Sequence, residues 1–429
     1  MTAVETLRIK NFAGIKDAQI ELSRMNVFIG PQASGKSVCA KLLFYFREII
    51  RRMTAGVASQ RTDAQIHMED EQRFFRYFPP ISWGAGDFVV EYAVGDFSVK
   101  VVRAESASAT VKVTYSALYA KLLSDVRQVK TQIEEERSKA PISHFLDPLT
   151  TNTLYSVIKG LSEKIDARLG NYTYFIPAGR SFFAALQNNI FSLMADNINI
   201  DPFLTEFGRL FEGMSYNYHY DIKEWLDEKL VKRVSQLICG TYLRVEGEDY
   251  ILAADGRQVP FGSTSSGQQE VLPLVITLVG LAPQDNKAMQ ATLFIEEPEA
   301  HLYPTAQREI VHLLAAVTDL ASDETSSQYV ITTHSPYILS ALNNLMYGAQ
   351  LAAQSPDKRA RVVQVLGDAA LVPAENVRAY AFGDGQVQSI IDAETGLVRA
   401  TILDSVSNEL AKEFGDLLDI EFEDEEMAA

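Results

Sequence analysis

The feature that most constrains the fold is the segment GPQASGKS at residues 30–37, which follows the apolar run MNVFIG and opens a helical pattern. Its spacing, G-x-x-x-x-G-K-[ST], places glycines where the backbone must turn tightly and present successive N–H groups to one anion. A helix that begins in such a loop adds the positive end of its dipole. A strand, this loop and a helix in that order predict a phosphate-binding loop at the carboxyl end of a strand.

The residues around the second glycine indicate what the loop binds. The Lys36 ammonium group can reach the β- and γ-phosphates of a nucleoside triphosphate, and the Ser37 hydroxyl can ligate Mg²⁺. We therefore predict a nucleoside triphosphate site, and the residues leave the choice between adenine and guanine open. The residues predicted to line the site are Gly30, Pro31, Gln32, Ala33, Ser34, Gly35, Lys36, Ser37 and Val38.

A second apolar run, ATLFIEE, ends in two adjacent carboxylates, Glu296 and Glu297. Like charges side by side at the end of a buried strand are costly unless a cation neutralises one of them. Mg²⁺ that arrives with the nucleotide supplies this cation. We therefore assign Glu296 to the magnesium shell, directly or through water, and Glu297 to polarising the attacking water.

The segment STSSGQQE at residues 263–270 is a serine-rich turn before a helix that we expect from about Gln268. It forms a second phosphate-binding helix start, although the chain already has one. A second phosphate-binding helix start in one chain is explained if it contacts a nucleotide that is bound by another protomer. The residues predicted to contact that nucleotide are Ser265, Ser266, Gly267 and Gln268.

His334 ends the strand-like run VITTH, which follows the two glutamates along the chain. A histidine at this place can hydrogen-bond the γ-phosphate or the attacking water, and so report whether the triphosphate is intact. We count Lys36, Glu297 and His334 as the candidate catalytic residues.

The rest of the chain alternates strands with helices, which indicates a mostly parallel α/β core built from both chain ends. The runs DFVVEYAV, FSVKVVRA and TVKVTYSA predict an antiparallel sheet near the N-terminal half. We expect helices over 37–53 and 115–137, the latter either as an amphipathic helix or as one arm of a short helical hairpin with 153–169. A helix-rich stretch follows over 182–240. The segment FGDGQVQSIIDAETGLVRATILD is interpreted as short strands and turns of a small cap.

Composition excludes several classes of function. The longest apolar run, VLPLVITLVGLA, is too short to cross a bilayer, and the N-terminus lacks a signal pattern, so we expect a cytoplasmic protein without a membrane role. The 2 cysteines and 6 histidines show no disulfide or zinc spacing. A net charge of −17 argues against a surface that binds nucleic acid everywhere.

Two charged clusters keep alternatives open. The first is either a solvated helix face or a local basic groove for nucleic acid, and it comprises Lys41, Arg47, Arg51, Arg52 and Arg61. The second, the acidic end of the chain over 416–429, is either a solubilising tail or an interaction tail.

The order of the four motifs resembles that of ABC-type ATPases, over residues 1–60 and 170–345. Ser266 stands where that family's signature has its first glycine, and Thr264 stands where it has a leucine. These departures fit the branch of the SMC, Rad50, RecF and OLD-type ATPases. The strings EEPEAHLYP, TTHSP and TSSGQQE resemble OLD-type and related AAA-annotated ATPases, several of which serve antiphage systems such as PARIS (AriA) and Septu (PtuA). OLD proteins usually continue into a Toprim nuclease domain, which we do not expect here.

The resemblance implies an α/β fold: an ABC-type P-loop ATPase head with an N-terminal antiparallel β subdomain, a helical lobe and a short helical hairpin insertion. It divides the single head of 1–429 into an N-lobe, an insertion, a helical lobe, a core with the later motifs, a C-terminal cap and the acidic tail. These parts cover 1–60, 84–170, 171–260, 261–345, 346–415 and 416–429.

The resemblance also implies ATP and Mg²⁺ as cofactors, and a homodimer or larger homo-oligomer that sandwiches two nucleotides head to tail. We expect an ATPase switch or scaffold in antiviral defence that controls a separate effector, such as a nuclease. The alternative is a RecF- or Rad50-like repair ATPase that engages DNA. A third reading is a nucleotide-binding module with little turnover.

Two residues keep open roles. The family has a glutamine after the strand that precedes its helical lobe, and this chain has Arg180 near that place, in IPAGRSFF. Arg180 is open to contact with the γ-phosphate, a partner or nucleic acid, or to a structural ion pair. His301 lies where the family's D-loop crosses the dimer interface, or it is a histidine at the start of a helix.

Overall fold

The computed structural model describes residues 3–104, 109–138, 160, 166–184, 200–220, 228–281, 291–318, 327–367 and 370–399. Within these ranges, the strands of the main sheet are β1 (Glu5–Phe12), β2 (Ile15–Leu22), β3 (Met25–Ile29), β4 (Val89–Val94), β5 (Phe97–Arg103), β6 (Val111–Tyr115), β7 (Tyr172–Ile176), β11 (Ala291–Glu296), β12 (Gln328–Thr333), β13 (Val377–Gly383) and β14 (Gln386–Ser389). A smaller antiparallel sheet comprises β8 (Thr241–Val245), β9 (Glu248–Leu252) and β10 (Gln258–Pro260).

Ten α-helices accompany these sheets in the same ranges: α1 (Lys36–Arg47), α2 (Ile49–Ala58), α3 (Asp63–Tyr77), α4 (Ala117–Ser138), α7 (Pro202–Tyr220), α8 (Glu228–Leu237), α9 (Ser266–Gly280), α10 (Pro304–Thr318), α11 (Pro336–Ala352) and α12 (Pro356–Leu366). Short 3-10 helices lie at Pro80–Ser82, Ala167–Gly170, Phe261–Ser263 and Ala374–Asn376.

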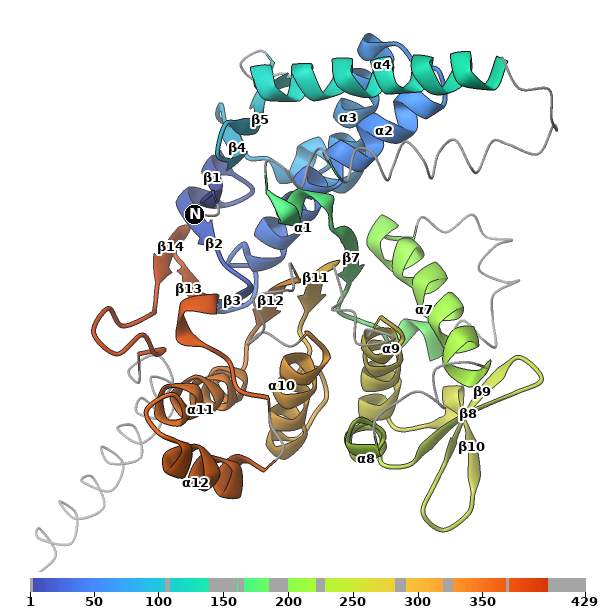
Figure 1. Ribbon diagram of the computed structural model, residues 1–429, viewed down its shortest axis with the longest axis vertical. Helices are drawn as coiled ribbons and strands as arrows, with labels where there is room; N and C mark the ends of the chain where they lie inside the picture. Colours follow the sequence, from blue (N-terminus) through green and yellow to red (C-terminus); the bar gives the residue numbers. More distant parts are fainter. Residues whose placement is uncertain are drawn as a thin grey trace, which may run out of the picture.

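The main sheet has the strand order β6-β5-β4-β1-β2-β14-β13-β3-β12-β11-β7 (Figure 1). The five strands from β13 to β7 are parallel to one another, whereas β1, β2, β4, β5 and β6 pair antiparallel. The parallel part combines β3 from the N-terminal region with β11, β12 and β13 from the C-terminal half. The predicted α/β core built from both chain ends, with an antiparallel N-terminal part, is confirmed.

The central parallel strands are buried along their whole length because helices cover both of their faces. Every residue of β3, β11 and β12 is buried, as expected for parallel strands. On β3, Val27 belongs to one apolar core and Phe28 to the other, and β11 and β12 alternate in the same way. The sheet is therefore the middle layer of three.

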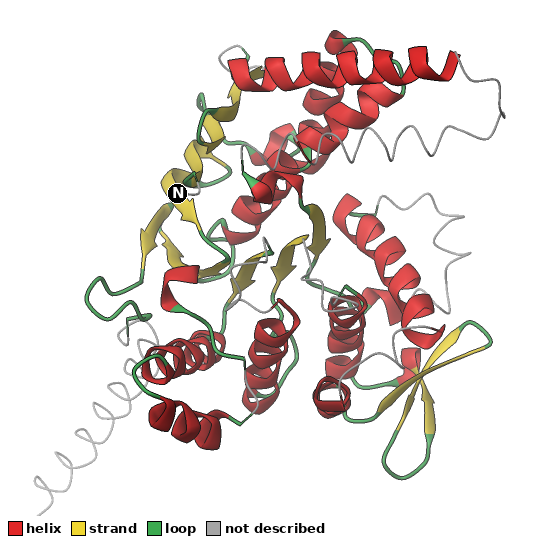
Figure 2. Ribbon diagram, viewed as in Figure 1, coloured by secondary structure: helices red, strands yellow, loops and turns green. Residues whose placement is uncertain are grey.

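Different helices fill the two outer layers (Figures 1 and 2). On one face, Phe44 of α1 packs its ring against Phe175 of β7 and Phe294 of β11. On the other face, α9, α10 and α11 contribute apolar side chains such as Val275, Leu314 and Leu342 to the second core. The smaller sheet lies beside α7 and α8, at the far end of the molecule from α4.

Three expectations about elements need correction or restriction. The helix expected over 37–53 is two helices, α1 and α2, which meet at Glu48. The segment expected as a cap supplies strands to the main sheet, because β13 pairs parallel with β3 and its Val377 and Ala379 are fully buried. The residues that lie outside the described ranges include 185–199, 221–227, the acidic tail, and residues 153–159 and 161–165 of the predicted hairpin arm. The helix predicted over 115–137 is confirmed as α4.

Candidate functional site

Three of the four sequence motifs meet at one edge of the sheet because they follow adjacent parallel strands. The loop at residues 30–37 follows β3, His334 follows β12, and Glu296 ends β11. Arg180 lies four residues after β7, the next strand along. Since carboxyl ends of neighbouring parallel strands meet at the same edge, the order of motifs along the chain becomes a cluster in space.

The phosphate-binding loop has a backbone shape that requires its glycines. A Cβ at Gly30 would collide with the Phe382 carbonyl oxygen of β13. At Gly35, φ is +101° and a Cβ would lie 2.7 Å from Ile15 Cγ1. The loop is therefore held between β13 on one side and Ile15 of β2 on the other, with no room for side chains at either glycine.

Lys36 lies inside the curve of this loop, beside acidic groups. Its Nζ donates hydrogen bonds of 2.8 Å to the carbonyl oxygens of Gly30 and Pro31. The same atom lies 3.5 Å from His334 Nδ1. Burial lowers the pKa of Lys36, and the charges of Glu297 and Glu299 oppose that shift.

Glu296 has the surroundings of a group that needs a cation. Its side chain is buried, and its Oε2 accepts a 3.3 Å hydrogen bond from the Ala178 N–H, while its Oε1 has no hydrogen-bond partner among the described residues. A buried carboxylate oxygen without a partner is costly, so an ion or a water at this oxygen fits. Within the described residues no group of three His, Cys, Asp or Glu side chains could hold a metal alone. Nucleotide oxygens and Ser37, which is exposed on the first turn of α1, would have to complete the shell.

The Glu297 side chain points toward His334, and its backbone is strained. Its φ is +44°, in the left-handed region that residues other than glycine rarely adopt. Its Oε1 lies 3.3 Å from His334 Nε2, and its side chain is 38% exposed. Thus Lys36, His334 and Glu297 form one chain of contacts, with the carboxylate open to solvent for a water molecule.

Glu299 is a residue of the site that the sequence reasoning missed. Its Oε1 accepts hydrogen bonds of 2.7 Å from the Thr333 hydroxyl and from the His334 N–H. Burial raises the pKa of Glu299, and these two hydrogen bonds oppose the shift. Glu299 thereby fixes the end of β12 that carries His334. The available signal was the third acid of EEPEA, which only Pro298 separates from the assigned pair.

Arg180 is a buried structural residue, which decides among the roles left open. Its side chain is 0% exposed, so it cannot reach a nucleotide or nucleic acid. Its donors reach the carbonyl oxygens of Pro177, Glu270, Glu296 and Glu297 at 2.7–3.0 Å. Burial lowers the pKa of Arg180, and nearby carboxylates, Glu270 foremost, oppose the shift.

The signature turn caps α9 and lies apart from the phosphate-binding loop. Ser265 is the N-cap, and it forms a capping box in which its Oγ accepts from the Gln268 N–H and the Gln268 side chain accepts from the Ser265 N–H. Ser265 and Ser266 are exposed. A Cβ at Gly267 would lie 3.0 Å from the His301 carbonyl oxygen. Among the described residues, no hydrogen bond or ion pair connects this turn to residues 30–37, so its predicted role in a partner's site stays a prediction.

His301 is not at a helix start. It lies in the turn after β11 with φ +59°, three residues before α10 begins. The helix-start reading is therefore excluded, and the D-loop role stays a prediction.

The basic cluster near the first motif does not form a free basic face. Each of its members pairs with a carboxylate: Lys41 with Asp201, Arg47 with Glu5, Arg51 with Glu48, Arg52 with Asp70 and Arg61 with Glu69. Arg47 is buried, and Arg52 is largely so. The local groove for nucleic acid that the sequence left open is therefore not supported.

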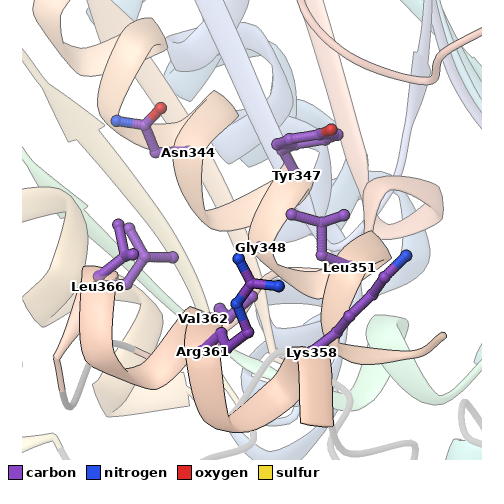
Figure 3. Close-up of a pocket in the computed structure, with 9 residues that line it drawn as sticks. Asn344, Tyr347, Gly348, Leu351, Lys358, Arg361, Val362 and Leu366 are labelled. Atoms are coloured by element: carbon purple, nitrogen blue, oxygen red, sulfur yellow. The ribbon is translucent and has the colours of Figure 1, made fainter. Parts of the chain in front are cut away.

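A separate cavity of about 490 Å³ lies between α11 and α12 (Figure 3). Apolar side chains such as Leu351, Val362 and Leu366 line it, together with Lys358 and Arg361. No residue of the four motifs reaches this cavity, so it is distinct from the predicted nucleotide site.

Comparison with known proteins places the chain in a family. Residues 25–340 match the family described as "AAA domain, putative AbiEii toxin, Type IV TA system". The chain belongs to this family. With the strand, loop and helix at residues 25–47, this makes it a P-loop ATPase at the level of the family. No curated protein matches the chain.

Similar solved structures are heads of SMC proteins. One is an SMC head bound to the C-winged helix domain of ScpA, at 13% identity and TM-score 0.42, covering 91% of this chain and 98% of that one. A second is an SMC head from Thermotoga maritima, at 11% identity, TM-score 0.37 and coverage of 90% and 98%. A third is an SMC head with an extended coiled coil, bound to the C-terminal domain of ScpA and derived from Pyrococcus furiosus, at 12% identity, TM-score 0.39 and coverage of 98% and 100%. At these scores we draw nothing further from the likeness.

In the parts of this ATPase that the structure describes, no helix is both long enough and apolar enough to cross a membrane.

Proposed function

We propose that this ATPase is a switch that binds and hydrolyses ATP, dimerises head to tail around Mg-ATP, and controls a separate effector, a nuclease or toxin, in antiphage defence. One observation carries the proposal. Lys36 Nζ lies 3.5 Å from one ring nitrogen of His334, and Glu297 Oε1 lies 3.3 Å from the other. A cation for the phosphates and a carboxylate for the water thus flank one histidine.

In the proposed reaction, water attacks the γ-phosphorus, and the bond to the bridging oxygen breaks to release ADP and phosphate. Lys36 stabilises charge on the phosphates, Glu297 orients the water and accepts its proton, and His334 senses the γ-phosphate between them. When bound, Mg²⁺ neutralises phosphate charge, and Ser37 and Glu296 are the residues that would hold it. Catalysis is mainly positioning and charge stabilisation.

The exposed signature turn supports the dimer. Ser265 and Ser266 stand at the positive end of α9, and exposed N–H groups at a helix start bind anions. Because no hydrogen bond or ion pair among the described residues joins this turn to the loop of its own chain, we propose that it completes the nucleotide site of a partner, with Gly267 and Gln268 shaping the turn. The Gln268 side chain serves the capping box and also donates to Ile238 O at 2.9 Å.

The proposed place in antiphage defence rests on the motif details. The strings EEPEAHLYP and TSSGQQE resemble those of OLD-type ATPases and of the PARIS and Septu ATPases. The family's own description names a putative toxin of a type IV toxin–antitoxin system. We propose that hydrolysis separates or rearranges the dimer and so changes its grip on the effector.

Glu297→Gln tests the proposed chemistry. We expect the variant to bind ATP with an affinity within about twofold of the wild type, and to lose about 100-fold or more in kcat, as for loss of a positioned general base. Phosphate release and equilibrium binding of labelled ATP measure the two quantities.

Glu91→Gln on β4, away from the site, is the matched control and should retain full activity. If Glu297→Gln hydrolyses ATP at the wild-type rate, the base assignment is wrong. If that shared rate is also close to zero, the protein is better described as a nucleotide-binding module.

A further inference from the structure

Arg180 joins two elements that carry different motifs. Its Nε donates a 2.9 Å hydrogen bond to the carbonyl oxygen of Glu270 on the signature helix α9. Its Nη1 and Nη2 donate to the carbonyl oxygens of Glu296 and Glu297, at 2.7 and 2.9 Å. One rigid guanidinium group therefore fixes the distance between α9 and the carboxyl end of β11, which Figure 1 shows as neighbouring elements.

The Glu270 carboxylate holds the other side of this connection. Its Oε2 accepts from the Arg180 N–H at 3.0 Å, and its Oε1 accepts from the N–H and the hydroxyl of Ser181, at 3.0 and 2.7 Å. Glu270 is buried, and its Oε2 also lies 3.5 Å from Arg180 Nε. Because Glu270 lies five residues after Ser265 on the same helix, a shift at the signature turn moves the anchor of Arg180.

The backbone that Arg180 holds is the strained one. Glu297 has φ +44°, its N–H donates to Thr332 O at 2.9 Å, and its carbonyl oxygen accepts from Arg180 and from the Ala300 N–H. A non-glycine residue keeps a left-handed conformation only where its surroundings fix it. Removing the guanidinium would let this backbone relax and would carry the Glu297 carboxylate away from His334.

We propose that Arg180 and Glu270 form a relay that makes the position of Glu297 depend on the position of the signature helix. When the signature turn contacts the nucleotide of a partner, α9 shifts, and Arg180 transmits the shift to Glu296 and Glu297 of the same protomer. The nucleotide at one site thereby sets the hydrolysis rate at the other. Arg180 is a positioning residue, and the relay rests on the proposed head-to-tail dimer.

A double-mutant cycle tests the relay. Ser265→Gly removes the signature hydroxyl and keeps most of the N-cap, since glycine is a tolerated capping residue. Arg180→Lys keeps the charge and loses the guanidinium fork that reaches four carbonyl oxygens. We expect each variant alone to lower kcat about 10-fold or more, with KM within about twofold of the wild type. If the two losses were independent, the kcat loss of the double variant would be their product. We expect it to be smaller than that product by a factor of at least about 5.

A matched control separates the relay from loss of any buried guanidinium. Arg52→Lys disrupts another largely buried pair, Arg52 with Asp70 between α2 and α3, away from the site. The kcat of Arg52→Lys should remain near the wild-type value. In the double variant with Ser265→Gly, the fold loss in kcat should equal the product of the two single losses. If Arg180→Lys does not fold, Glu270→Gln replaces it at the other end of the relay with the same expected result.

The outcomes distinguish the relay from the function on which it rests. If Arg180→Lys and Glu270→Gln keep the wild-type kcat, or if their losses multiply fully with that of Ser265→Gly, the relay is overturned and the proposed ATPase stands. If Ser265→Gly has no effect on kcat, the signature turn does not complete a partner's site. The proposed dimer then fails, and the relay fails with it.

Discussion

The three carboxylates of the segment EEPE differ in their surroundings, and these differences separate their roles. Glu296 is buried with one oxygen lacking a protein partner, Glu297 is partly exposed beside His334, and Glu299 is buried and holds the end of β12. The sequence identified the adjacent pair because like charges at a strand end need an explanation. The sequence did not identify Glu299, because a buried acid and an exposed acid in a turn look the same in a sequence.

Glu299 gives a pH-dependent prediction. Burial raises its pKa above the ordinary value of 4.5. The stability that this group contributes is therefore fully present below the ordinary pKa and is lost as the pH rises through the raised pKa. Glu299→Gln cannot ionise, and its carbonyl oxygen can still accept from Thr333 and from the His334 N–H. We expect equal unfolding free energies for the variant and the wild type near pH 4, and a variant more stable by about 1 kcal/mol at neutral pH.

Urea denaturation at the two pH values measures this difference. Glu91→Gln serves again as the control for removing a carboxylate elsewhere, and its difference from the wild type should not grow with pH. A wild type that is more stable than Glu299→Gln at neutral pH would contradict the assignment.

At the scale of the element, β13 connects the C-terminal region to the phosphate-binding loop. It lies between β14 and β3, and its Phe382 carbonyl oxygen fills the space next to Gly30. The residues from Phe382 onward have the pattern of short strands and turns, but the parallel pairing of β13 with β3 joins residues more than three hundred positions apart. Local periodicity carries no information about such a partner, which is why the segment was expected to be a separate cap.

Ala379→Asp tests the importance of β13. Ala379 is fully buried and pairs in register with Val27 of β3. An unpaired carboxylate at this position should cost ~3 kcal/mol or more of unfolding free energy, because its charge loses hydration without a partner. It should also weaken ATP binding through the loop beside β13.

Gln388→Asp on β14 adds the same charge at an exposed position, and its unfolding free energy should stay within about 0.5 kcal/mol of the wild type. Thermal and urea unfolding with labelled-ATP binding measure both variants. Equal stability of Ala379→Asp and Gln388→Asp would show that β13 is dispensable for the core.

At the scale of the whole molecule, the charge distribution bears on which function is favoured. The net charge is −17, and the arginines and lysine that the sequence offered as a nucleic-acid groove all pair with carboxylates. Ser265 and Ser266 at the start of α9 are exposed, and in the described part of the chain no hydrogen bond or ion pair joins them to residues 30–37. This arrangement fits a switch that needs a second protomer better than a clamp for DNA.

Ser266→Glu tests the proposed dimer. The side chain is exposed at the first position of α9, where an acidic residue suits the helix dipole, so the unfolding free energy should change by less than about 0.5 kcal/mol. Its negative charge would face the phosphates of a partner's nucleotide. With Mg-ATP, we expect light scattering to show that the Glu297→Gln variant is a dimer. We expect the double variant Glu297→Gln, Ser266→Glu to be a monomer.

Ala360→Glu adds the same charge to the exposed face of α12 and should leave the dimer intact. A dimer that persists in Ser266→Glu would exclude the signature turn from the interface.

The sequence by itself was enough to predict the phosphate-binding loop, the paired glutamates and the role of His334, and to identify the class of fold. These features depend on local chemistry: glycines for a tight turn, a lysine and a serine for phosphate and magnesium, and apolar runs that end in polar groups. Their order along the chain was enough to predict that they meet, because carboxyl ends of parallel strands share one edge.

Only the tertiary structure decided the roles of Arg180 and Glu299, the pairing of the basic cluster, and the place of β13. Each of these depends on burial and on partners distant in sequence, such as Glu270 for Arg180 and Glu5 for Arg47. A sequence does not show whether an arginine is exposed to water or is buried and donates hydrogen bonds to four carbonyl oxygens. Its surroundings, which the fold creates, determine what it can do.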